Sequence, residues 1–324
     1  MFLKFYGLRE QPFGVTPDPR FLYLSPGHRE ALASLYYGID SERGFLALIG
    51  KPGTGKTTLL FQLLEKFRGA ARTAFIFQTQ CDSREFMRFL LAELGCETME
   101  HDFVRMHDEF NKLLLQEASA GRRFIIVVDE AQNLDRSVLE TIRLLSDFET
   151  PRAKLLQIVL SGQPELADKL ASRKLSQLKQ RISLLSGLAP LSVEESGNYV
   201  NHRLRIAGYS GDPLFTPEAM HLVTEFTEGI PRNLNNFCFN AMSLGCALQQ
   251  RVIGAELVEE VIGDLDMKKH VTEMPMVQPS PLGPPRMQPT LGDASQESLS
   301  PEEAKTYMQE LVGQLSAWKR KPLA

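Results

Sequence analysis

Short apolar runs alternate with amphipathic stretches along residues 1–191. Apolar runs of strand length occupy residues 45–49, 73–79, 123–128 and 155–160. Between them, apolar side chains recur at helical spacing over residues 57–67, 83–94, 106–118 and 135–146. Runs that are apolar on both faces and separated by helices are typical of a parallel sheet with both faces covered. The pattern therefore predicts an α/β domain over residues 1–191, with a parallel sheet and helices on both of its faces.

The pattern changes after residue 191, where helical signals follow one another without strands. Ser192 and Glu195 form a capping box, and Thr216 followed by a proline is a second helix start. The expected helices cover residues 192–207, 216–226, 232–249 and 255–265. This succession predicts an all-helical domain over residues 192–267.

The composition shifts again near residue 268. Residues 268–299 are rich in proline, serine and glutamine, which predicts a disordered linker. An amphipathic helix is expected over residues 300–319, and its apolar seam consists of Ala304, Met308, Leu311, Leu315 and Trp318. Two heptads are too few for an independent coiled coil. The helix therefore either packs against its own chain or docks on a protein partner.

Composition and charge are those of an ordinary globular protein. Apolar residues make up 43% and charged residues 23% of the chain. The net charge of -4 does not support a DNA partner, although the basic run 319–321 near the C-terminus leaves one open. No apolar run is long enough to cross a membrane, and the N-terminus lacks the apolar region of a signal peptide. The sequence therefore predicts a cytoplasmic protein.

A glycine-rich turn joins the first expected strand to the helix after it. Its residues match GxxxxGK[ST] and are Gly50, Lys51, Pro52, Gly53, Thr54, Gly55, Lys56 and Thr57. Between a strand and a helix, such a turn surrounds phosphate oxygens with backbone N–H groups. Lys56 is expected to reach the β- and γ-phosphates, and the Thr57 hydroxyl to ligate Mg²⁺. Together with Thr58, these are the predicted nucleotide-binding residues.

Two acidic residues, Asp129 and Glu130, follow the apolar run at residues 123–128. Asp129 is expected to hold Mg²⁺, directly or through water, and is the second predicted metal ligand beside Thr57. Glu130 is expected to polarise an attacking water molecule. A second carboxylate at this position is typical of nucleotide-hydrolysing enzymes, so Glu130 is the predicted catalytic base.

The order of these motifs resembles that of AAA+ ATPases. The resemblance narrows to ExeA-type ATPases, also called general secretion pathway protein A. It is carried over residues 1–266 by FYGLREQPFGVTPDPRFLYLSPGHREAL, DEAQNL, LLSDFET, LSGQPEL, QLKQRI and GIPRNLNNFC. The resemblance implies a P-loop NTPase fold, ATP and Mg²⁺ as cofactors, and hydrolysis of ATP.

The same resemblance implies roles for residues outside the two motifs. Gln163 or Ser161 would sense the γ-phosphate, unless the two residues form only a turn after their strand. Arg232 would reach back from the helical domain to the γ-phosphate. Arg181 would be an arginine finger supplied to the neighbouring subunit of a homo-oligomer. Arg173 is the rival for this role, and an ordinary exposed arginine is the alternative interpretation of Arg181.

Two residue pairs near the N-terminus complete the expected site. Pro12-Phe13 and Tyr23-Leu24 are expected to line an adenine pocket, although core packing explains these side chains equally well.

The expected function is hydrolysis of ATP to ADP and phosphate that powers or switches assembly of a bacterial envelope complex, of secretion or pilus type. Full-length secretion relatives carry a membrane-spanning segment and a periplasmic region after the ATPase, where this sequence has the proline-rich stretch and the helix over 300–319. The alternative is a nucleotide-switched DNA-binding adaptor of the transposition-helper type. Expected partners are ATP, further copies of the chain and a protein bound by the C-terminal helix. Peripheral attachment to the inner membrane is left open.

Overall fold

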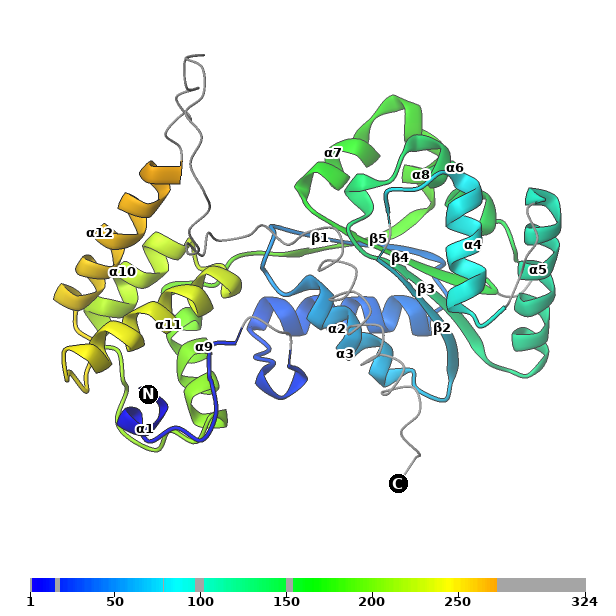
Figure 1. Cartoon of the computed structure of the whole chain (residues 1–324). Helices are drawn as coiled ribbons and strands as arrows, with labels where there is room; N and C mark the ends of the chain where they lie inside the picture. The colour runs from blue at the N-terminus through cyan, green and yellow to red at the C-terminus, as the bar shows by residue number, and fades with distance from the viewer. Residues whose placement is uncertain (1, 15–17, 78, 97–101, 150–153, 273–324) are drawn as a thin grey trace, which may run out of the picture. The chain divides into compact units, whose positions relative to one another are not determined.

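The computed structural model describes residues 2–14, 18–77, 79–96, 102–149 and 154–272 (Figure 1). The expected amphipathic helix over residues 300–319 lies outside the described residues. So does the expected linker over residues 268–299, apart from residues 268–272, which continue the last helix of the described chain.

The described residues include a five-stranded parallel sheet with the strand order β2-β3-β4-β1-β5. The strands are β1 (Phe45–Gly50), β2 (Ala71–Ile76), β3 (Arg123–Val128), β4 (Leu156–Gly162) and β5 (Ile182–Leu188). The expected α/β fold with a parallel sheet is confirmed. The sequence pattern did not reveal β5, because this strand lies at the edge of the sheet and its side chains are at best half-buried except at Leu188.

Helices cover both faces of the sheet, as expected (Figure 1). The helices of this part are α2 (Pro26–Asp40), α3 (Lys56–Lys66), α4 (Ser83–Glu93), α5 (Phe103–Ser119), α6 (Arg136–Leu145), α7 (Pro164–Ala171) and α8 (Ser176–Arg181). Alternate side chains of β3 enter opposite cores: Phe124 and Ile126 pack with α4, α5 and α6, whereas Ile125 packs with α2 and α3. This alternation follows from the two-residue period of a strand.

A bundle of helices follows β5. It consists of α9 (Val193–Ile206), α10 (Pro217–Thr227), α11 (Pro231–Ala247) and α12 (Ala255–Thr272). The expected capping box is present, because the Ser192 hydroxyl accepts from the backbone N–H of Glu195 and the Glu195 carboxylate accepts from that of Ser192. Thr216 caps α10 in the same way, through the N–H of Ala219. None of the described helices is both long and apolar enough to cross a membrane.

The N-terminal segment packs with this bundle. Its helix α1 (Phe2–Tyr6) and the buried side chains of Leu8, Phe13 and Phe21 belong to the same hydrophobic cluster as residues of α9, α10, α11 and α12. The sequence-based boundary at residue 191 groups this segment with the α/β part. The packing instead joins the two ends of the described chain in one core.

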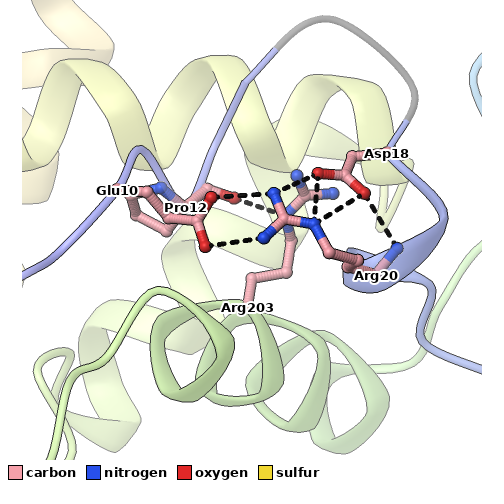
Figure 2. A network of polar contacts seen from close by, with 5 residues as sticks. All are labelled: Glu10, Pro12, Asp18, Arg20 and Arg203. Carbon is pink, nitrogen blue, oxygen red and sulfur yellow. Dashed lines mark hydrogen bonds and ion pairs between the residues drawn. The ribbon is translucent and has the colours of Figure 1, made fainter.

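A buried arginine fastens this segment to α9 (Figure 2). Arg203 is 8% exposed, and its Nε donates to the carbonyl oxygen of Pro12 at 2.6 Å. A second guanidinium nitrogen donates to the Tyr199 hydroxyl at 3.0 Å, and the guanidinium carbon lies 4.9 Å from the centroid of the Phe21 ring. Beside it, Arg20 binds the carboxylates of both Glu10 and Asp18. Burial raises the pKa of Asp18, but the hydrogen bonds from Arg20 outweigh it, so that this pKa lies below its usual value.

Candidate active site

The glycine-rich turn lies at the carboxyl end of β1, the strand that lies between β4 and β5 in the sheet. Gly50 is the last residue of β1 and Lys56 the first of α3. Gly53 and Gly55 both have left-handed backbones, with φ of 81° and 94°. A Cβ atom on Gly53 would also lie 2.8 Å from the Cβ of Arg232. Only glycine fits there, which is what a backbone that cradles phosphates requires.

The Lys56 side chain lies under this turn. It is 5% exposed, and its Nζ donates to the carbonyl oxygens of Gly50 at 2.9 Å and Lys51 at 3.2 Å. Burial lowers the pKa of Lys56, and the charge of Arg232 adds to this, while Glu130 and Asp129 partly offset it. The charge of Arg232 thus acts against that of Lys56, and a phosphate anion bound near both would stabilise both cations.

The Asp129 carboxylate accepts hydrogen bonds from hydroxyl groups in two other parts of the chain. Its Oδ2 accepts from the Thr57 hydroxyl at 2.5 Å, and its Oδ1 accepts from the Ser161 hydroxyl at 2.8 Å. Asp129 follows β3, Ser161 belongs to β4, and Thr57 lies in the first turn of α3. A hydroxyl and a carboxylate, both hard oxygen donors, suit Mg²⁺. Thr57 and Asp129 are therefore the residues that would hold this ion next to the phosphates.

Glu130 stands beside Asp129 in a left-handed backbone conformation, with φ of 51°. Its Oε2 accepts from Gln132 Nε2 at 2.6 Å and from Gln163 Nε2 at 3.2 Å. The expected sensor residues therefore contact different acids: Ser161 binds Asp129, and Gln163 binds Glu130. The sequence motif DEAQNL contains Gln132, but it gave this residue no role of its own.

Residues of the helical bundle reach the phosphate turn. The backbone N–H of Arg232, in the first turn of α11, donates to the Gly53 carbonyl oxygen at 3.3 Å. Lys51 Nζ forms an ion pair with Glu228 Oε2 at 2.7 Å, just before that helix. A Cβ on Gly229 would lie 2.0 Å from the backbone oxygen of Leu191, so the link between α10 and α11 also requires glycine. The bundle therefore contacts the phosphate turn through both backbone and side-chain atoms.

Arg181 lies at the opposite end of the sheet. It precedes β5, whose first residue Ile182 pairs with Phe45 at the start of β1. At the usual rise of a strand, the length of β1 separates it from the phosphate turn by roughly 17 Å. Arg181 donates to the Ser146 hydroxyl at 3.1 Å and forms an ion pair with Asp147. Arg173, the rival, is exposed at the start of a short 3₁₀ helix (Arg173–Leu175).

A further residue, His28, contacts the phosphate turn through the backbone of Thr54. It is 5% exposed, and its two ring nitrogens contact the Thr54 carbonyl oxygen at 2.9 Å and the Ser25 hydroxyl at 2.8 Å. Because a carbonyl oxygen only accepts, Nε2 donates to Thr54 and, in the neutral ring, Nδ1 accepts from Ser25. Burial lowers the pKa of His28, which favours this neutral form. A single histidine near a helix start gives no sequence signal for such a role.

The residues expected around the adenine lie where the N-terminal segment passes from the bundle to the sheet. Phe13 is buried in the bundle core. The Tyr23 ring packs against those of Tyr199 and His202, with centroids 6.1 Å and 5.6 Å away. Leu24 packs instead with the core of α2 and α3. In this segment Tyr23 thus contacts the bundle core and Leu24 contacts the core of α2 and α3. Ser25 and His28 follow them in the chain.

Comparison with known proteins agrees with this geometry. Residues 39–170 match the AAA domain family. General secretion pathway protein A of Aeromonas hydrophila is 40% identical over 250 residues, which cover 75% of this chain and 44% of that protein. The ORC2 protein of Aeropyrum pernix, solved as ADPNP and ADP complexes, is similar with a TM-score of 0.58 at 16% identity, over 79% of this chain and 71% of that one. The RuvB branch migration motor of Thermotoga maritima gives a TM-score of 0.53 at 14% identity, over 76% and 73%.

At such identities the two solved structures show a shared fold alone. Together with the AAA domain match, the parallel sheet, the phosphate turn and the acidic pair define the class: the chain has the P-loop NTPase fold and contains an AAA domain. Within that class its sequence is similar to that of general secretion pathway protein A, an ExeA-type protein. The matched part spans less than half the length of that relative, 44%.

Proposed function

We propose that the chain binds Mg²⁺-ATP between the phosphate turn and the bundle and hydrolyses it with Glu130 as the base. The observation that supports this most directly is the contact of Thr57 with Asp129, with Glu130 on the next residue. It joins the end of β3 to the phosphate turn after β1, at the carboxyl edge of the sheet where open α/β folds bind their ligands. Hydrolysis here needs positioning and charge rather than a covalent intermediate.

Each predicted residue has a part in this proposal. The backbone of residues 50–58 and the Lys56 ammonium bind the phosphates, and Thr57 and Asp129 hold Mg²⁺. Glu130 orients the attacking water. Gln163 senses the γ-phosphate from beside Glu130, since Ser161 is occupied with Asp129. Arg232 follows the γ-phosphate from the bundle, and its charge already acts on Lys56.

Arg181 is proposed to act on a neighbouring copy of the chain. The length of β1 between it and its own phosphate turn excludes a direct role in its own site. An arginine at the rim of one subunit can complete the site of the next, which makes turnover depend on assembly. The proposal therefore includes a homo-oligomer. In it, Arg181 leaves its ion pair with Asp147 and binds the nucleotide of the neighbouring subunit instead.

The biological role we propose is ATP-driven or ATP-switched assembly of a bacterial envelope complex, in the cytoplasm or at the inner membrane. It is supported by the 40% identity to a general secretion pathway protein. A DNA-binding adaptor is the alternative, but the net charge of -4 gives it no support. Measuring turnover with and without duplex DNA over a range of salt concentrations distinguishes the two roles.

The site is tested by two variants and one matched control. Lys56→Ala should abolish ATP binding, because its ammonium contacts the phosphates before reaction. Glu130→Gln should keep ATP binding but lower turnover about 10²-fold or more, because it removes the base and keeps the shape. Lys66→Ala, at the exposed end of the same helix, should leave both unchanged. Turnover at the parent rate in Glu130→Gln would show that the base is a different residue.

A further inference from the structure

Gln132 binds residues that follow two neighbouring strands, Glu130 after β3 and Gln163 after β4. It lies in a short 3₁₀ helix (Ala131–Asn133) directly after Glu130. Its Nε2 donates to Glu130 Oε2 at 2.6 Å, and its Oε1 accepts from the backbone N–H of Gln163 at 3.1 Å. Both ends of one amide are thus used: its nitrogen binds Glu130, two residues after β3, and its oxygen binds Gln163, the residue after β4.

The turn that carries Gln132 is itself held in place. Lys169 Nζ, from α7, donates to the backbone oxygens of Gln132 at 2.5 Å and Leu134 at 2.9 Å. The backbone of Glu130 needs such support, because its φ of 51° lies in the left-handed region, which residues other than glycine rarely adopt. The side-chain amide and the anchored turn together fix where the Glu130 carboxylate points.

We propose that Gln132 is a positioning residue for the base Glu130, and that it couples this base to Gln163. The proposal rests on the proposed function. Gln132 and Gln163 both donate to the same oxygen, Oε2 of Glu130. That leaves Oε1 to accept the proton of the attacking water. A shift of Gln163 toward a γ-phosphate acts on Glu130 directly, and through the Gln132 amide, whose oxygen is bound to the Gln163 backbone.

The decisive variant is Gln132→Glu, which keeps the size and the acceptor oxygen but removes the donor. It places a second carboxylate within hydrogen-bond distance of Glu130, and two such groups share a proton. We expect kcat to fall about tenfold or more, a part of what a general base contributes. The acid limb of the kcat profile should also move to higher pH. Affinity for a fluorescent ADP analogue should stay within about twofold, because Gln132 does not contact the phosphate turn.

Gln132→Ala and Asn133→Asp complete the experiment. Gln132→Ala should lower kcat without moving the acid limb, because it removes the donor but adds no acid. Asn133→Asp adds the same charge one residue further on, where the side chain is exposed, and should leave kcat, its pH profile and the melting temperature unchanged. A purely structural role for Gln132 would instead lower the melting temperature and the ADP affinity of both Gln132 variants together.

The outcomes separate this inference from the function on which it rests. If Glu130→Gln is inactive while Gln132→Glu keeps the parent kcat and pH profile, Glu130 is the base and our inference about Gln132 is wrong. If Glu130→Gln turns over at the parent rate, the assignment of the base itself fails. Loss of ADP binding in Gln132→Glu together with a lower melting temperature would also overturn the positioning role.

Discussion

Replacing Arg203 by methionine should loosen the N-terminal segment from the helical bundle. Methionine keeps the length and the apolar stem, but it removes the charge and all five N–H donors. The carbonyl oxygen of Pro12 then loses its partner in a buried place, and the Tyr199 hydroxyl keeps only the bond that it donates to Asn235. The contact of the guanidinium with the Phe21 ring is lost as well.

The magnitude follows from these contacts. Hydrogen bonds made by a charged donor are worth about 1.5–3 kcal/mol each, and a desolvated cation–π contact adds about 1–2 kcal/mol. Among the described residues no carboxylate forms an ion pair with Arg203, so the gain from no longer burying its guanidinium offsets part of this sum. We therefore expect the free energy of unfolding to fall by about 2–4 kcal/mol in Arg203→Met.

Urea unfolding of the full chain measures this loss, and trypsin cleavage at Arg9 and Arg20 reports whether the segment has been released. Arg205→Met is the matched control: Arg205 lies on the same helix but is exposed, so its loss should cost no more than about 0.5 kcal/mol. The loss of unfolding free energy in Arg203→Lys should lie between those of Arg203→Met and Arg205→Met, since lysine keeps the charge but lacks the planar guanidinium with its several donors. Equal stability of the Arg203→Met and Arg205→Met variants would refute the view that Arg203 fastens the segment.

Three further predictions concern the site and the tail. Arg181→Ala should lower turnover about 10³-fold and leave ATP affinity unchanged, and mixing it with Lys56→Ala should restore activity; absence of rescue would exclude a finger acting between subunits. Burial lowers the pKa of His28, so as the pH falls His28 is protonated in the unfolded chain before it is protonated in the folded chain. Stability from His28 is therefore present above about pH 6.5 and lost as the pH falls through the lower folded pKa; in His28→Gln, denaturant unfolding should lose this component of the pH dependence. Removing residues 273–324 should leave basal turnover and melting temperature unchanged, and a lower melting temperature would show that the tail packs on the ATPase.

The backbone geometry of the candidate site was largely predictable because its signals are local. The phosphate turn needs glycines at fixed places, with left-handed backbones at Gly53 and Gly55, and Lys56 and Thr57 follow at fixed spacing. The strand before Asp129 is apolar on both faces because helices cover the sheet on both sides. Helix starts such as Ser192 depend on hydrogen bonds within a few residues. In each case the physical cause lies within a short stretch of chain.

The tertiary structure decided what depends on residues far apart in the chain. As an edge strand that is mostly half-exposed, β5 shows no apolar run, and only its pairing with β1 reveals it. Gln132 and His28 lie in motifs that give neither residue a role, and each meets its partner only through folding: Gln163 after β4 for Gln132, and the Thr54 carbonyl for His28. The N-terminal segment joins the bundle through Arg203, 191 residues from Pro12. The sequence by itself thus determined the local backbone geometry and the residue types of the phosphate site. Packing decided which distant groups meet, because the free energy of burying apolar surface does not depend on how far apart the residues are in the sequence.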